Sequence, residues 1–199
     1  MLQLTVPGGH KEVLLHCCCA PCSGAVLECM LQNGLRPVVF FSNSNIVPKE
    51  EYVLRRGELE RYCHSLGLTT VDDVYDHQAW LDFVLSDKSY ADAPERGQRC
   101  LNCFKFRLLR AARYAAANNL PVLTTTLASS RWKSLEQVDE AGRWAVETVM
   151  AESLTGPLWW PQNWRKGGLQ PRRSQIICEQ QFYNQDYCGC EFSKRHDKD

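Results

Sequence analysis

At 199 residues the chain can bury one sizeable hydrophobic core, and we expect a single domain over residues 1–199. Hydrophobic residues make up 44% of the chain and charged residues 23%, as in an ordinary globular protein without low-complexity tracts. Acidic and basic residues are equal in number, so the net charge by itself gives no indication of a polyanionic partner.

The first half of the chain alternates short apolar runs with segments of helical periodicity. Two apolar runs predict buried strands at residues 12–16 and 37–41, and a third strand is predicted at residues 69–74. Helices are predicted at residues 23–32, 49–66 and 77–85.

The second half continues this alternation and then loses it. Residues 86–98 are polar and irregular, and we expect a mobile loop there. A helix, a strand and a second helix are predicted at residues 100–118, 122–126 and 135–153. After Gly156 we expect a structured loop, a helix over residues 172–182 and a cysteine-bearing tail.

Strands that alternate with helices of ten or more residues predict right-handed βαβ units. We therefore expect an α/β fold, Rossmann-like or PP-loop-like, in which helices flank a mostly parallel sheet. Ligands of such folds bind outside the carboxyl ends of the strands. Residues 16–22, 42–48 and 127–133 each follow a predicted strand, so we expect them to meet at one rim of the sheet.

The start of the chain has no charged segment followed by an apolar stretch, and therefore no recognisable secretory signal. No apolar run approaches the roughly 18 residues needed to span a bilayer. We expect a cytoplasmic protein that has no membrane partner. Thiols are kept reduced in that compartment, so grouped cysteines there more often bind metals or do redox chemistry than form structural disulfides.

Three cysteine groups are the strongest chemical signal among the eleven cysteines. They are Cys18-Cys19, flanked by Cys17 and Cys22, then Cys100-x-x-Cys103, and finally Cys188-Gly-Cys190. A disulfide framework, a zinc site and a redox metal centre could all use such groups. An odd number of cysteines cannot all pair in disulfides, and adjacent cysteine ligands are uncommon in zinc sites. The spacing favours a redox metal centre over structural zinc.

The first two groups together can supply four thiolates. Cys18 and Cys19 lie at a predicted strand-to-helix turn, where free backbone N–H groups lower thiol pKa values. Cys100 and Cys103 lie at the start of another predicted helix. Together these two pairs would give a metal centre its four thiolates. Cys17, Cys29 and Cys63 are expected in the core.

The third group has two interpretations. Cys188 and Cys190 could bind a metal, or they could form a small and strained disulfide of the labile kind that takes part in catalysis. Gly189 permits the backbone angles that such a ring needs.

Polar and aromatic segments are candidates for substrate binding. Five residues beyond the second strand suit a polar substrate, unless they only form a loop and an exposed helix: Asn43, Asn45, Tyr52, Arg55 and Arg56. Hydroxyl groups after the fourth strand, followed by Arg131 and Lys133, suit a sugar or a phosphate. Arg165 and Lys166 lie among tryptophans, a pattern that fits RNA bases and phosphates but is more often a buried aromatic cluster. Six basic residues and no acid between Arg96 and Arg113 also keep a nucleic-acid substrate open.

Six motifs in order resemble one family over residues 14–193, nearly the whole chain. They are HCCCAPC, SNSNIVPKEEYVLRR, RCLNC, TTLASSRWK, WRKGG and YNQDYCGCEFS. The chain resembles the QueH-type epoxyqueuosine reductases, which are cobalamin-independent enzymes of tRNA queuosine synthesis. Cys17 is an extra thiol relative to the family pattern, and SSRWKS departs from its more usual Ser-Pro form.

The resemblance implies an enzyme that reduces the epoxide of epoxyqueuosine at the tRNA wobble position, giving queuosine and water. It implies a [4Fe-4S] cluster on Cys18, Cys19, Cys100 and Cys103, and a redox-active pair at Cys188 and Cys190. Cys22 stands where relatives have Cys or Asp, and is a candidate ligand of an additional iron. No cobalamin is expected, whereas an electron donor is required. His16, Asp186 and Tyr187 are candidate proton donors because they lie near these motifs.

Two other functions stay open from the sequence. A PP-loop-like tRNA-modifying enzyme would suit the predicted sheet, although HCCCAPCSG stands where that superfamily has its Ser-Gly-Gly loop. A zinc-stabilised tRNA-binding module without catalysis would also use grouped cysteines.

Overall fold

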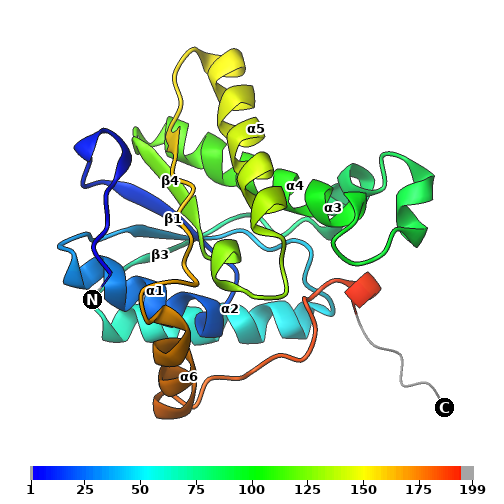
Figure 1. Cartoon of the computed structure of the whole chain (residues 1–199). Coiled ribbons are helices and arrows are strands. Elements are labelled where there is room, and N and C mark those ends of the chain that lie inside the picture. Colours follow the sequence, from blue (N-terminus) through cyan, green and yellow to red (C-terminus); the bar gives the residue numbers. More distant parts are fainter. Residues whose placement is uncertain (1, 194–199) are drawn as a thin grey trace.

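One parallel sheet organises the computed structural model, which describes residues 2–193 (Figure 1). Its five strands lie in the order β3-β2-β1-β4-β5, and every neighbouring pair is parallel. The strands are β1 (Val13–Cys17), β2 (Val38–Phe41), β3 (Thr70–Asp72), β4 (Val122–Thr125) and β5 (Leu158–Trp159). The predicted α/β class with a parallel sheet is therefore confirmed.

Helices cover both faces of the sheet, as Figure 1 shows. One layer contains α1 (Ala20–Gln32), α2 (Lys49–Ser65) and α6 (Leu169–Glu179). The other contains α4 (Gln98–Ala117) and α5 (Leu135–Ser153), with α3 (His77–Val84) packed on α4. Because both faces are covered, all residues of β1 and β4 are buried, which explains why these strands appear in the sequence as short uninterrupted runs.

The last quarter of the chain departs from the prediction. Residues 158–159, expected within a loop, form the edge strand β5, whose flanks are bonded to β4 by Leu158 N–H to Pro121 O and Trp160 N–H to Leu123 O. A strand of two residues is too short to show periodicity. Helix α6 begins three residues before the predicted start, with Pro171 in its first turn, where a missing N–H costs no helical hydrogen bond.

The predicted loop over residues 86–98 is irregular but contains a 3₁₀ helix, Lys88–Asp92. The Asp87 carboxylate accepts the Ser89 N–H at 2.9 Å. Arg99 donates to the carbonyls of Tyr90 and Ala91 at 2.9 and 2.6 Å. The start of α4 therefore fastens this segment to the domain.

The strand order places a topological switch point between β1 and β4. From β1 the chain adds β2 and β3 on one side, and then returns to add β4 and β5 on the other. Connections on opposite sides of the sheet leave a crevice at the carboxyl ends of these two strands. In the described part of the chain, no helix combines the length and apolar character that crossing a membrane requires.

Two helical glycines allow a test of this packing. A Cβ at Gly142 in α5 would lie 2.2 Å from the ring of Trp159, which Asp139 holds by a 2.6 Å bond from the indole N–H. We expect Gly142→Ala to lower the free energy of unfolding by about 1–3 kcal/mol, because the ring must move. The exposed Gly57 in α2 has open space at its Cβ, so Gly57→Ala should raise it by about 0.5–1 kcal/mol. Urea denaturation of both variants measures the difference, and equal effects would contradict this account.

Candidate metal and redox site

The segments that follow three strands meet at the predicted rim. The backbone N–H of Cys18, after β1, donates to Thr126 Oγ1, after β4, at 3.1 Å. Asn43, after β2, donates its side-chain amide to the carbonyl of Cys17 at 2.9 Å. Ser129 Oγ donates to the carbonyl of Cys22, also at 2.9 Å. The convergence predicted from the sequence is confirmed.

Three cysteines form a compact sulfur cluster at the start of α1, which we call the cysteine triad. The Sγ atoms of Cys18, Cys19 and Cys22 all lie within 4.8 Å of one another, and those of Cys18 and Cys19 are 3.8 Å apart. Cys19 has extended backbone immediately before the helix, and Pro21 lies in the first turn. One helical turn then brings Cys22 back beside the other two. All three are buried, so the triad is a ready-made set of soft donors for a metal.

Positive charge faces the triad. Hydrogen bonds from Cys19 and Cys22, helped by the nearby Lys133 and Arg107, hold the pKa of Cys18 well below its usual range. Arg107 is buried and donates to the carbonyl of Ser42 and to the side chain of Asn43. Within residues 2–193, neither Lys133 nor Arg107 has a carboxylate partner. Both cations are therefore available to offset thiolate charge.

A second group of cysteines lines a neighbouring hollow of about 380 Å³. Cys100 and Cys103 are one turn apart at the start of α4, and Cys188 and Cys190 come from the C-terminal tail. Burial raises the pKa of Cys103 to about 11 and that of Cys190 to about 12, so without a metal both favour the neutral thiol. All eleven cysteines lie among the described residues, and none is joined to another in a disulfide.

The cysteine triad lines a first hollow of about 200 Å³, and this hollow adjoins the second one, which Cys100 and Cys103 line. Five residues border both of them: Ser130, Trp132, Lys133, Gln185 and Cys188. The structure groups Cys18 and Cys19 with Cys22, and it places Cys100 and Cys103 in the second hollow. The four predicted ligands thus lie on both sides of Lys133 and Cys188, around one continuous region.

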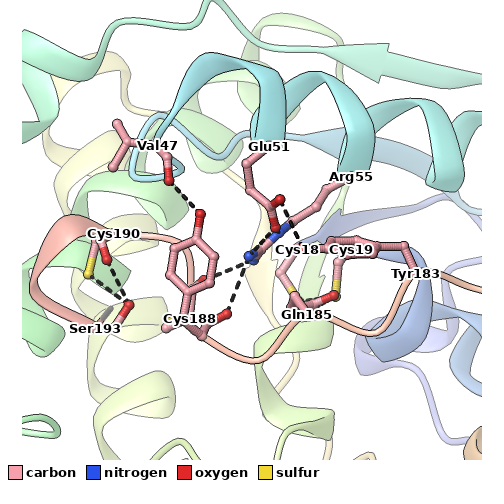
Figure 2. Close-up of polar contacts among 11 residues, drawn as sticks. Cys18, Cys19, Val47, Glu51, Arg55, Tyr183, Gln185, Cys188, Cys190 and Ser193 are labelled. Carbon is pink, nitrogen blue, oxygen red and sulfur yellow. Dashed lines mark hydrogen bonds and ion pairs between the residues drawn. The ribbon is translucent and has the colours of Figure 1, made fainter. Parts of the chain in front are cut away.

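The tail that carries Cys188 and Cys190 is fastened by Arg55 (Figure 2). The Arg55 guanidinium donates to the carbonyls of Cys188 and Tyr187 at 3.2 and 3.3 Å, and pairs with Glu51 at 2.6 Å. It also lies over the Tyr187 ring, 5.0 Å from its centroid. Opposite, Val47 N–H donates to Gly189 O at 2.9 Å, and Tyr187 OH donates to Val47 O.

Gly189 is required in this tail for two reasons. Its φ of +125° lies in the region that side chains disfavour, and a Cβ there would come within 2.9 Å of Ile46. The C-G-C spacing therefore serves the close approach of the tail to the β2–α2 loop, as well as the two thiols.

The predicted substrate residues separate into two sets. Asn43 and Arg55 border the first hollow, and Asn45 borders the second, where its buried Oδ1 has no hydrogen-bond partner within residues 2–193. Tyr52 packs between Phe41 and Tyr75, and Arg56 pairs with Asp72 at 2.5 Å.

The two predicted substrate residues near the end of the chain, Arg165 and Lys166, also differ in their surroundings. Arg165 donates to the carbonyls of Ser130 and Lys133, so its guanidinium holds the loop after β4. Lys166 is exposed. The nearby Trp160 and Trp164 are buried and pack edge to face, so here the aromatic cluster is part of the core.

Sequence reasoning missed Arg107 and Gln185 as site residues. Arg107 looked like one of six cations in a basic stretch, and the sequence gives no sign that it is buried. Gln185 donates its amide to Cys19 Sγ at 2.9 Å, as Figure 2 shows, across a separation of 166 residues. Its position two residues before the YCGC motif was the only local signal.

His16 is not suited to the predicted role of proton donor. It is fully buried, and its ring nitrogens bond to Thr125 Oγ1 and to the carbonyl of Ser42. Burial, reinforced by Arg107, lowers its pKa to about 3, so the ring is neutral near pH 7. The predicted core cysteines Cys17, Cys29 and Cys63 are indeed buried.

Comparison with known proteins identifies a consistent set of relatives. Residues 13–196 match the family described as Epoxyqueuosine reductase QueH. The protein of that name from Histophilus somni is 42% identical over 193 residues, which cover 97% of this chain and 76% of the relative. Those from Acinetobacter baylyi and Thermotoga maritima are 38% and 31% identical, covering 98% and 91% of this chain and 85% and 89% of the relatives.

Arg55 and its neighbour Arg56 form a matched pair for testing how the tail is held. In Arg55→Met, the Tyr187 and Cys188 carbonyls lose charged donors, so alkylation of the half-buried Cys190 should become at least about tenfold faster. Arg56→Met removes a more exposed ion pair with Asp72 and should leave that rate unchanged. Timed alkylation with peptide mass spectrometry measures both rates. Equal rates in the two variants would show that Arg55 does not hold the tail.

Proposed function

Because the chain belongs to the epoxyqueuosine reductase QueH family, we propose that it is an oxidoreductase that converts epoxyqueuosine in tRNA to queuosine and water. The observation that carries this proposal is the arrangement of the cysteines. Thiols from three separate segments border two adjoining hollows at the switch point of the sheet, where ligands of such folds bind.

The donors at this site fit an iron–sulfur cluster. They are sulfur atoms, most are buried, and two cations without carboxylate partners in the described chain face them. We infer that Cys18, Cys19, Cys100 and Cys103 hold a [4Fe-4S] cluster, and that Cys22 holds an additional iron. When bound, such a group supplies electrons at a potential that nearby charges and hydrogen bonds tune. Gln185, which donates to Cys19 Sγ, is one such hydrogen-bond donor.

Cys188 and Cys190 match the demand of the reaction. Converting an epoxide to an alkene breaks two C–O bonds and consumes two electrons and two protons, and the oxygen leaves as water. Oxidation of two thiols to one disulfide releases two electrons and two protons. The pair therefore balances one turnover, and an external electron donor must then reduce the disulfide. Cys188 borders both hollows, a position that suits a shuttle between them.

Lys133 is placed to act on the epoxide oxygen. Its side chain borders both hollows, and the surrounding Cys188, Cys18 and Cys22 raise its pKa although burial opposes this, so the ammonium keeps its charge. A fixed cation beside a bond that breaks toward oxygen stabilises the developing negative charge. We infer that Lys133 binds the oxygen that leaves.

Metal analysis tests the ligand assignment. When the protein is purified without oxygen, we expect about four irons and four acid-labile sulfides per chain from the cluster. The additional iron comes on top of these four. Cys100→Ala and Cys103→Ala should each lower both contents by at least about tenfold. Cys22→Ala should lose iron but keep sulfide, and Cys29→Ala, a buried cysteine outside both hollows, is the matched control. Thermal melts establish that each variant is folded.

Two results would overturn this assignment. Full iron and sulfide in Cys100→Ala and Cys103→Ala would remove those residues from the ligand set. One zinc and no sulfide in the unaltered protein would instead indicate the zinc-stabilised tRNA-binding module.

The redox pair is tested by activity. Oxygen-free incubation of the holoprotein with epoxyqueuosine-containing tRNA and a strong reductant should lower the nucleoside mass by one oxygen. Cys188→Ser and Cys190→Ser should keep iron and sulfide but slow multiple turnover by at least about a hundredfold. Cys178→Ser changes an exposed cysteine on α6 and should have no effect. No mass loss with the unaltered protein would reject the proposed reaction, and full turnover in the serine variants would reject the pair.

A further inference from the structure

Trp132 is the least buried of the large aromatic side chains in the described chain. Its side chain is 78% exposed, whereas Trp80, Trp160 and Trp164 are buried. An exposed indole leaves a large apolar surface in water, and the next most exposed aromatic residue of the described chain, Tyr183, is only 37% exposed. Trp132 borders both cysteine-lined hollows, so this surface lies at their common mouth.

Four hydrogen bonds from three side chains hold the backbone on either side of Trp132. Gln170 donates to Ser129 O at 2.8 Å, Arg165 to the carbonyls of Ser130 and Lys133, and Arg96 to Trp132 O at 3.0 Å. The loop that carries the exposed ring is therefore fixed. A ring presented on a fixed backbone loses little conformational entropy when a ligand covers it.

The surroundings of the ring select an anionic and aromatic ligand. Three cations, Arg96, Arg99 and Lys133, border the second hollow with Trp132, against two acids. Arg99 is buried and donates to backbone carbonyls, whereas Arg96 is exposed and is the cation that a phosphate can reach from solvent. An aromatic face beside several cations is the arrangement that binds single-stranded RNA, because a base stacks on the ring while the phosphates meet the cations. A purely apolar partner would leave these charges uncompensated.

We propose that Trp132 is the platform on which a nucleobase of the RNA substrate stacks, at the mouth of the two cysteine-lined hollows. This inference rests on the proposed function, which supplies the RNA. To bring its epoxide to the cysteines, the modified base must leave its stack in the anticodon loop, and the indole face replaces the stacking that this base or its neighbour loses. Trp132 is thus a substrate-positioning residue, while the cysteines and Lys133 below it do the chemistry.

Three variants test the stacking role. Trp132→Ala should raise the Kd for a fluorescently labelled anticodon stem–loop RNA, and the KM for epoxyqueuosine-containing tRNA, by about ten- to a hundredfold. Trp132→Phe keeps an aromatic face and should restore most of the affinity. Leu154→Ala removes another exposed apolar side chain, 86% exposed and bordering neither hollow, and should change nothing.

The dependence of Kd on salt separates stacking from damage to the cationic rim. In Trp132→Ala the slope of log Kd against log salt should equal that of the unaltered protein, because no phosphate contact is lost. A smaller slope in this variant would show that the substitution disturbs the cations, and would overturn the stacking role.

Other outcomes also decide the matter. Trp132→Ala with unaltered Kd and KM, in a protein that reduces the tRNA, would reject the platform and leave the proposed function standing. If Trp132→Ala binds RNA normally but the variant enzyme accepts electrons more slowly from a protein electron donor, the exposed surface binds the donor. That result would overturn the inference. If the unaltered protein binds RNA through Trp132 but never reduces the epoxide, the platform stands and the proposed reaction fails.

Discussion

The divergence of the chain after β1 and β4 is the constraint on which the site depends. Parallel strands all end at the same edge, and at the switch point their continuations turn to opposite faces of the sheet. The hydrogen bond from Cys18 N–H to Thr126 Oγ1 joins the two strands just beyond this divergence. The cysteine triad is thereby fixed against the loop after β4, which carries Trp132 and Lys133. The sulfur-rich floor and the aromatic mouth are two consequences of one topological feature.

Gathering thiols at this point creates an electrostatic problem that the fold resolves with cations. Thiolates removed from water are unfavourable unless a metal or a positive charge compensates them. Arg107 is held in place by the Ser42 carbonyl and the Asn43 side chain, so its charge belongs to the scaffold. Lys133 supplies the second charge from the loop after β4. Because neither has a carboxylate partner in the described chain, their positive charge is directed to the sulfurs.

Much of the fold followed from sequence periodicity, because periodicity reports burial on long elements. The helix over residues 135–153 was predicted with its observed bounds, and the four longer strands within a few residues. The strand β5 is two residues long and lies at the sheet edge, so no pattern could reveal it. The convergence at the rim was predictable because it follows from parallel topology alone. Which sulfurs lie closest was not, since the grouping of Cys22 with Cys18 and Cys19 depends on the backbone turn at Cys19.

The arginines show most clearly where sequence reasoning reaches its limit. Arg55 was predicted to bind a polar substrate and Arg165 to bind RNA. Both guanidinium groups instead donate to backbone carbonyls, those of the tail and of the loop after β4. A cation in a sequence carries no sign of whether its partner is a phosphate or the protein's own backbone. These two instead position the tail and the loop that border the hollows. RNA recognition must then rely on what they leave uncovered at the mouth, and the largest such surface is the indole of Trp132, held in place by the arginines that a charge count would have assigned to the RNA itself.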